Sequence, residues 1–174
     1  GFAPAEELRA ALPAAAQQVA YVGVAGTAGK TAAAALTAAV LQAAGFVTGL
    51  YCAGCEPLEQ RVRINGKPVA DALLCAAAET LSRAKPLPRA AAELAAAAAC
   101  FGAAGCRLAV VELPDAGLAE ALSHMPVCVV TSIGPDGVSR SVERSAALAA
   151  GVMREGAICV TAPEQPKAVL SELI

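Results

Sequence analysis

The residues best suited to chemistry form a glycine-rich segment near the amino terminus, Gly26-Thr27-Ala28-Gly29-Lys30-Thr31. The glycines allow the backbone to curl, so that its N–H groups can point inward at an anion. Lys30 is long enough to reach a β- or γ-phosphate, and the Thr31 hydroxyl is a suitable Mg²⁺ ligand. The segment predicts a phosphate-binding loop, although the general pattern places another glycine five residues before Gly29, where this chain has Val24. The alternative is a glycine turn before an ordinary helix.

A phosphate-binding loop must connect a strand to a helix, and the flanking sequence fits this requirement. Residues 20–25 form a short apolar run, as in a strand buried on both faces. Residues 32–44 are rich in alanine and other helix formers. The helix dipole would then direct its positive end at the bound anion. The sequence therefore predicts the order strand, loop, helix.

Glu112 is a second candidate because it ends a predicted strand over residues 107–113. Strands alternate with helices in the second half of the chain, which is typical of βαβ units and a mainly parallel sheet. Ligands bind such sheets at the carboxyl ends of the strands, so Glu112 is expected near the loop, where its carboxylate could hold Mg²⁺ or a water. A charge reaching solvent is the alternative. Asp136 is a weaker candidate, since Pro-Asp-Gly is common in turns.

The other elements follow from hydrophobic periodicity and from glycine and proline signals. A helix over residues 4–18 should break or kink at Pro13, and Asn65-Gly66 predicts a hairpin between residues 61–64 and 67–69. Further strands are expected over residues 47–53, 127–133 and 157–161, and helices over residues 71–83, 89–104, 117–123, 141–154 and 165–173. The prediction is an α/β, three-layer, P-loop NTPase-like fold. It has a mainly parallel sheet of about five strands, helices on both faces and a small β-hairpin insertion, in one domain over residues 1–174.

Composition argues against two kinds of partner. The net charge is −2, tryptophan is absent and no basic stripe occurs, so a nucleic-acid partner is not expected. Residues 31–55 carry no charge and are long enough to span a membrane. Gln42 and two glycines interrupt this stretch, however, and a buried helix followed by a strand explains it without a membrane. Acidic residues near the amino terminus also argue against a signal peptide.

The seven cysteines are scattered and odd in number, as expected of reduced thiols that pack as small hydrophobic residues in the cytoplasm. Cys52 and Cys55 form a lone C-x-x-C. A zinc site would need further ligands, and the single histidine, His124, has no partner at a suitable spacing. A metal or redox role for this pair remains the alternative.

Several of these motifs together resemble a known family. Residues 22–31 and 44–51 are similar to the ATP-binding domain of Mur ligases and folylpolyglutamate synthases, more closely the second. Three further segments resemble family motifs: residues 61–69 (E-R-I-x-I-N-G-x-P-I), 103–112 (A-E-A-x-x-D-L-A-V-L-E) and 129–136 (V-I-T-S-I-G-x-D-H). Residues 150–152 resemble the end of a K-A-G-I motif. The resemblance runs in order from about residue 20 to the end of the chain.

The resemblance implies an ATP-dependent ligase. Enzymes of this family phosphorylate a carboxylate with ATP, and an amine then attacks the acyl phosphate while Mg²⁺ ions hold the phosphates. The resemblance implies that the phosphates of ATP or ADP bind at Gly26, Thr27, Ala28, Gly29, Lys30 and Thr31. It also implies that Thr31 and Glu112 are Mg²⁺ ligands.

Departures from the family pattern argue against turnover by this chain alone, and no catalytic residue is assigned. Ala28 replaces an asparagine, and Gly137 and Ala149 replace a histidine and a lysine that support a second metal in the family. Residues 52–58 replace the folate-type S-P-H-L stretch, which leaves the acceptor substrate unnamed. Residues 114–119 replace a G-L-G-G-R-x-D-A-T-N motif. The rest of the ATPase domain and the carboxy-terminal domain are not in the sequence.

Three functions are therefore open. The first is a catalytically degenerate domain that binds ATP or ADP with Mg²⁺. The second is a non-enzymatic protein-interaction module, in which an apolar surface meets another copy or a separate partner chain. The third is one half of a split ATP-dependent amide ligase.

Overall fold

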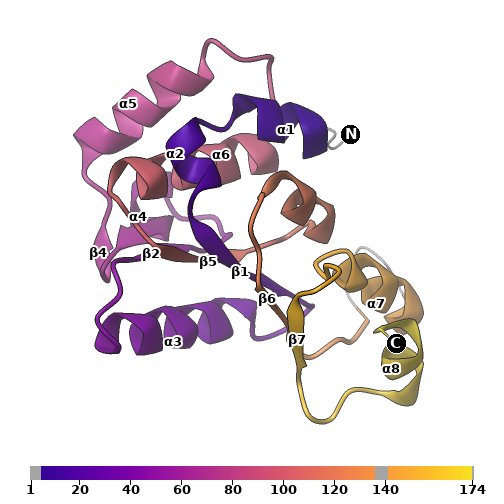
Figure 1. Ribbon diagram of the computed structural model, residues 1–174. Coiled ribbons are helices and arrows are strands. Elements are labelled where there is room, and N and C mark those ends of the chain that lie inside the picture. The colour runs from indigo at the N-terminus through magenta and orange to yellow at the C-terminus, as the bar shows by residue number, and fades with distance from the viewer. Residues whose placement is uncertain (1–4, 136–140, 174) are drawn as a thin grey trace.

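A seven-stranded sheet runs through the molecule in the order β4-β3-β2-β5-β1-β6-β7 (Figure 1). The computed structural model describes residues 5–135 and 141–173. The strands are β1 (Ala20–Ala25), β2 (Thr48–Tyr51), β3 (Val62–Ile64), β4 (Lys67–Pro68), β5 (Leu108–Glu112), β6 (Val127–Val130) and β7 (Ile158–Thr161). The helices are α1 (Ala5–Ala11), α2 (Ala14–Gln17), α3 (Lys30–Ala43), α4 (Leu58–Arg61), α5 (Asp71–Leu81), α6 (Arg89–Ala103), the 3₁₀ helix η1 (Ala116–Ala121), α7 (Val142–Ala150) and α8 (Lys167–Leu173).

The predicted α/β fold with a mainly parallel sheet is confirmed. Strands β2, β5, β1, β6 and β7 are parallel, and β1 lies in the middle, paired with β5 on one side and β6 on the other. The hairpin β3–β4 also forms as predicted, with both turn residues at positive φ, 49° for Asn65 and 75° for Gly66. Strand β3 of this hairpin pairs antiparallel with β2, so the hairpin extends the same sheet.

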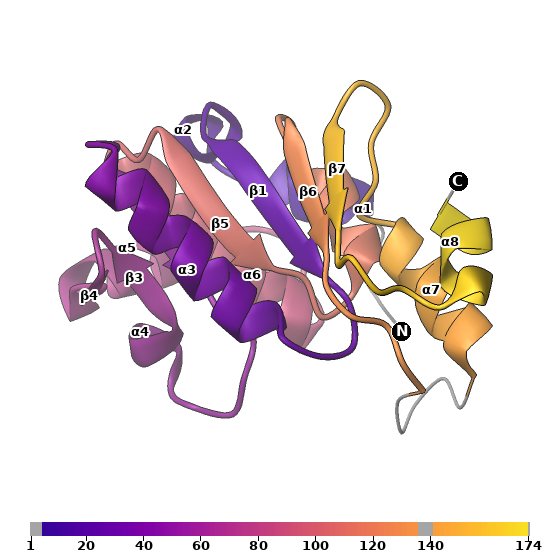
Figure 2. The same ribbon diagram turned by 90° about the horizontal axis from the view of Figure 1, so that it is seen from below.

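Helix α3 covers one face of the sheet (Figure 2). Ala34 and Ala38 pack on the strand residues Val22, Val24 and Val110. Alanine side chains are short, so the helix can lie close to the strands and bury their branched side chains completely. This packing fixes the start of α3 at the carboxyl end of β1.

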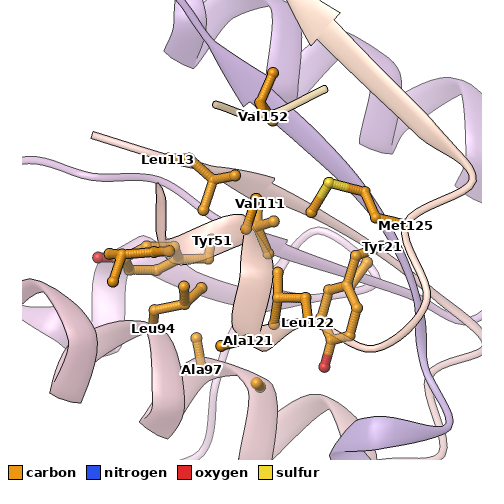
Figure 3. Close-up of a cluster of buried hydrophobic side chains, with 14 of the residues drawn as sticks. Tyr21, Tyr51, Leu94, Ala97, Val111, Leu113, Ala121, Leu122, Met125 and Val152 are labelled. Atoms are coloured by element: carbon orange, nitrogen blue, oxygen red, sulfur yellow. The ribbon is translucent and has the colours of Figure 1, made fainter. Parts of the chain in front are cut away.

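The opposite face carries the larger core, which α1, α2, α5, α6 and η1 enclose. Figure 3 shows Tyr21, Tyr51 and Val111 from the strands packed with Leu94 of α6 and Leu122, which follows η1. Nine residues of α6 are buried, six of them alanine. Gly49 is required in β2, because a Cβ there would lie 2.5 Å from the ring of Phe101.

Differences from the predicted elements have local causes. The expected first helix is two helices, and Pro13, at φ −65° and ψ 153°, precedes the first residue of α2. The expected helix over residues 117–123 is the 3₁₀ helix η1. The short helix α4 was not predicted; it begins directly after Pro57. Helix α7 begins after Ser141, whose hydroxyl accepts a hydrogen bond from the Arg144 amide, and it ends before residue 154.

The uncharged stretch over residues 31–55 folds as predicted, into α3 and β2. Across the described ranges, no helix combines the length and the apolar character needed to cross a membrane.

Candidate functional site

The glycine-rich loop joins the carboxyl end of β1 to the amino terminus of α3. Gly26 has a φ of 131°, and a Cβ at this position would lie 2.2 Å from the Thr131 hydroxyl oxygen. Gly29, with a φ of 84°, is the residue before α3. Both conformations favour glycine. Val24 stands where the general pattern has glycine, but it lies within β1 and is fully buried, so the curl of the loop begins after it.

Two kinds of positive group lie at the loop: the Lys30 ammonium and the amides that begin α3. The Lys30 ammonium folds back and donates to the Gly26 carbonyl at 3.0 Å, and within residues 5–135 and 141–173 it forms no ion pair. The amides of Lys30, Thr31 and Ala32 begin α3, and no hydrogen-bond acceptor for them is found in the described parts of the chain. Amides at the start of a helix lack intrahelical partners, so they are available to an anion.

Thr27 and Ala28 attach the loop to the segment that follows β6. Their amides donate to the Ser132 carbonyl at 3.1 and 3.2 Å, and the Thr27 hydroxyl donates to the same oxygen. The Thr27 hydroxyl also accepts from the Gly134 amide at 2.8 Å. These two residues therefore hold the loop in place here, and direct contact of their amides with a phosphate stays a prediction.

Glu112 lies beside the loop, at the carboxyl end of β5. Its side chain is 4 % exposed, and its Oε2 accepts hydrogen bonds from the Thr31 hydroxyl at 3.0 Å and from the Ala53 amide at 3.2 Å. The parallel register of β1 and β5 places Glu112 opposite Val24, so Glu112 reaches Thr31, which is 81 positions away in the sequence. The two predicted metal ligands are therefore in contact.

The donor set fits a magnesium ion. Glu112 is buried, yet no lysine, arginine or histidine pairs with it in the described structure. A buried carboxylate without a cation is costly, so a site of this kind favours a cationic ligand. Carboxylate and hydroxyl oxygens are suitable ligands for Mg²⁺, which usually takes one or two protein ligands and completes its shell with phosphate oxygens and water.

The loop after β2 is held by a buried arginine whose role none of the sequence motifs indicates. Arg61 is 5 % exposed; it donates to the Glu56 carbonyl at 2.7 Å and to the Cys52 carbonyl at 3.4 Å, and it forms an ion pair with Glu93 of α6 at 3.1 Å. A charged residue at the start of an apolar strand was the available signal. Because Ala53 lies in this loop, Arg61 supports the amide that contacts Glu112.

The charges around Arg61 shift two ionisation equilibria. Burial alone would raise the pKa of Glu93, but hydrogen bonds and charge from Arg89 and Arg61 outweigh it and lower the pKa of this carboxyl. Burial, together with the nearby Glu93 charge, raises the pKa of Tyr51 to about 12. The cluster therefore contains an ionised Glu93 and a neutral Tyr51 at neutral pH.

Cavities lie on both sides of the loop. One of about 220 Å³ is lined by Gly26, Thr27, Asp115 and Ala149, among others. Another of about 430 Å³ is lined by Thr31, Leu50, Cys52, Cys55 and Arg63, among others. The fold thus brings the loop and Glu112 to one edge of the sheet, with open space on either side, while Asp136 and Gly137 lie outside the described residues.

The similarity of this chain to known proteins lies in its fold. No family model and no curated protein matches the sequence. Among solved structures, the chain is similar to folylpolyglutamate synthetase from Lactobacillus casei, with 25% identity and a TM-score of 0.83 over 99% of this chain and 45% of that one. It is also similar to E. coli FolC in complex with DHPP and ADP (21% identity, TM-score 0.83, 99% of this chain and 44% of that one).

A third similar structure is Mycobacterium tuberculosis folylpolyglutamate synthase complexed with ADP (25% identity, TM-score 0.82, 99% of this chain and 44% of that one). This chain spans less than half of the length of these proteins. The resemblance stated from the sequence is therefore confirmed at the level of the fold.

Proposed function

We propose that residues 1–174 form one nucleotide-binding domain of the folylpolyglutamate synthase and Mur ligase type, which binds ATP or ADP together with Mg²⁺. The contact between Thr31 and the buried, cation-free Glu112 carries this proposal. It adjoins the Lys30 loop and the open amino terminus of α3. The nucleotide complexes among the similar structures support the same assignment.

Each part of the site has a distinct role in this proposal. The amides at the start of α3 and the Lys30 ammonium bind the phosphates, because they provide positive charge and no carboxylate of the described chain forms an ion pair with Lys30. Thr31 and Glu112 would hold Mg²⁺, which supplies neutralisation of phosphate charge. The Thr27 hydroxyl holds the loop against Gly134. The loop would therefore already be ordered before a nucleotide binds.

We propose that this site binds nucleotide without turning it over unaided. Ala149, at the position where the family resemblance implies a lysine, is buried and lines the cavity beside Gly26. In the described residues, no three His, Cys, Asp or Glu side chains gather as a further metal site. The described residues therefore offer no such cluster to a second metal.

The cysteines and the net charge bear on the compartment and on the partners of the domain. All seven cysteines are free, which is typical of the cytoplasm. The net charge of −2 gives no footprint for nucleic acid. We therefore place the domain in the cytoplasm, with nucleotide as its ligand and no nucleic-acid or membrane partner.

Thermal unfolding tests the nucleotide site. Saturating ADP with Mg²⁺ should raise the melting temperature by about 5–10 °C, since ligand at a hundred times its Kd stabilises by about 2.7 kcal/mol. Lys30→Ala should abolish the rise. Lys67→Ala, which removes an exposed lysine from the hairpin, should retain it. An unchanged melting temperature of the wild-type protein at saturating nucleotide would contradict the proposal.

One observation favours a second function, a protein-interaction surface. Ile158 and Val160 of β7 are 67 % and 50 % exposed. Their register partners Val127 and Val129 pack against the α3 side of the core, so all four face the side of the sheet that α3 covers only in part (Figure 2). Exposed apolar patches of this kind mark interfaces. Either a second copy or the separate half of a split ATP-dependent amide ligase would cover it.

A further inference from the structure

Two cysteines flank the residue whose amide contacts Glu112. Cys52 and Cys55 lie in the irregular segment between β2 and α4, and both line the cavity of about 430 Å³ that Thr31 also lines. Cys55 is exposed and Cys52 is half-buried. The other five lie elsewhere: Cys100, Cys106 and Cys128 are buried, Cys75 is exposed on α5, and Cys159 is half-buried on β7.

Both ends of this loop are bonded to Arg61, whose guanidinium also donates to the Glu56 carbonyl, next to Cys55, at 2.7 Å. The Cys52 amide donates to the Arg61 carbonyl at 3.1 Å, and the Cys52 carbonyl accepts from the Arg61 guanidinium. Gly54 and Cys55, by contrast, are exposed. Closing a bond between the two sulfurs would therefore turn the exposed Gly54–Cys55 part of the loop, which lies between the residues bonded to Arg61.

We propose that Cys52 and Cys55 form a reversible disulfide that controls the Mg²⁺ ligand Glu112, an inference that rests on the proposed nucleotide site. The link is the peptide between Cys52 and Ala53. Its carbonyl is bonded to Arg61, and its N–H is bonded to Glu112 Oε2. Turning the adjacent Ala53–Gly54–Cys55 segment strains this peptide, and the strain weakens the hydrogen bond that holds Glu112 beside Thr31.

The oxidant is a low-molecular-weight disulfide. The Cys55 thiolate attacks one of its sulfurs, which forms a mixed disulfide and releases one small thiol. The Cys52 sulfur, after loss of its proton, then attacks the Cys55 sulfur, so that the protein disulfide forms and the second small thiol leaves. Two protein thiols are oxidised and one small disulfide is reduced. The exposed Cys55 reacts first because it is accessible, and the half-buried Cys52 resolves the intermediate.

Thiol counting on the folded protein tests the disulfide. In a Cys75→Ser, Cys159→Ser background, oxidised glutathione should release two glutathione molecules per chain, and intact mass should show the loss of two hydrogen atoms. Cys52→Ser should stop at the mixed disulfide, with one glutathione retained. If Cys52 remains free while Cys55 keeps its glutathione in the parent protein, no internal disulfide forms and the proposal is overturned.

Nucleotide titration tests the control of Glu112. The oxidised protein should bind ADP with Mg²⁺ about fivefold or more weakly than the reduced protein, and both should bind equally in excess EDTA. Cys55→Ser should bind alike with and without oxidant. Equal Mg²⁺-dependent affinities of the oxidised and reduced forms would overturn the switch. Failure of the reduced protein to bind nucleotide would instead refute the proposed function, while the thiol count would still decide the disulfide.

Discussion

At the scale of single residues, Glu112 carries the largest consequence. Its carboxylate is buried against two hydrogen-bond donors, the Thr31 hydroxyl and the Ala53 amide, and it faces no cation in the described structure. A residue that served stability alone would be poorly chosen for this place, because a neutral side chain would avoid the cost of burying a charge.

Glu112→Gln should therefore have opposite effects on stability and on binding. Without nucleotide, the free energy of unfolding should rise by about 1 kcal/mol, since an unpaired buried charge is removed. The Mg²⁺-dependent affinity for ADP should fall about 10- to 100-fold, as expected when a ligand of the metal is changed. Urea denaturation and calorimetric titration measure the two effects, and Glu120→Gln, at an exposed position, is the control. An unchanged affinity in Mg²⁺ would show that Glu112 is not a ligand.

At the scale of elements, the ion pair between Arg61 and Glu93 joins α4 to α6. Arg61 ends α4, Glu93 lies on α6, and the loop after β2 is bonded to the same guanidinium. One side chain thus sets the position of three segments that adjoin the site. The pair was beyond prediction from sequence, because its members are 32 positions apart and no periodic signal indicates that they meet.

This cluster should make stability depend on acid pH. The pKa of Glu93 is lowered in the folded chain, so its contribution is fully present above the unfolded-state value, near 4.3 for glutamate, and is lost as the pH falls through the lower folded value. Glu93→Gln should cost about 2–3 kcal/mol at pH 7, and the difference from wild type should shrink as the solution becomes more acidic. Urea denaturation from neutral to acid pH measures it. Glu79→Gln, on an exposed face of α5, should show no such convergence.

At the scale of the whole molecule, the uncovered part of the sheet predicts association. Replacing Ile158 and Val160 by lysine should convert an associating protein to monomer without loss of ADP binding, because the site lies at the carboxyl edge of β1 and β5 and not on β7. Sedimentation across a concentration series measures this, with Leu170→Lys on α8 as the control. A wild-type chain that sediments as a monomer at every concentration, with no partner retained, would contradict the interaction function.

Most of the fold could be predicted from the sequence because its signals are local. The loop, the alanine helix, the Asn65-Gly66 hairpin and the βαβ alternation each depend on residues close together in the chain. The predicted proximity of Glu112 to the loop also holds, since a parallel sheet brings strand ends together. The contacts that complete the site are not local. They depend on which strands lie side by side in the sheet, as in the contacts of Ala53 with Glu112 and of Thr27 with Ser132.

The bonds from Thr27 and Ala28 to Ser132 also constrain the order in which the chain folds. Thr27 and Ser132 are 105 residues apart, and β1 can pair with β6 only after that later strand has been synthesised. The glycine-rich loop therefore leaves the ribosome long before its anchor exists. Pairings this distant in sequence are slow to form. We therefore expect the segment that identifies the domain most clearly from its sequence to reach its final conformation late in folding.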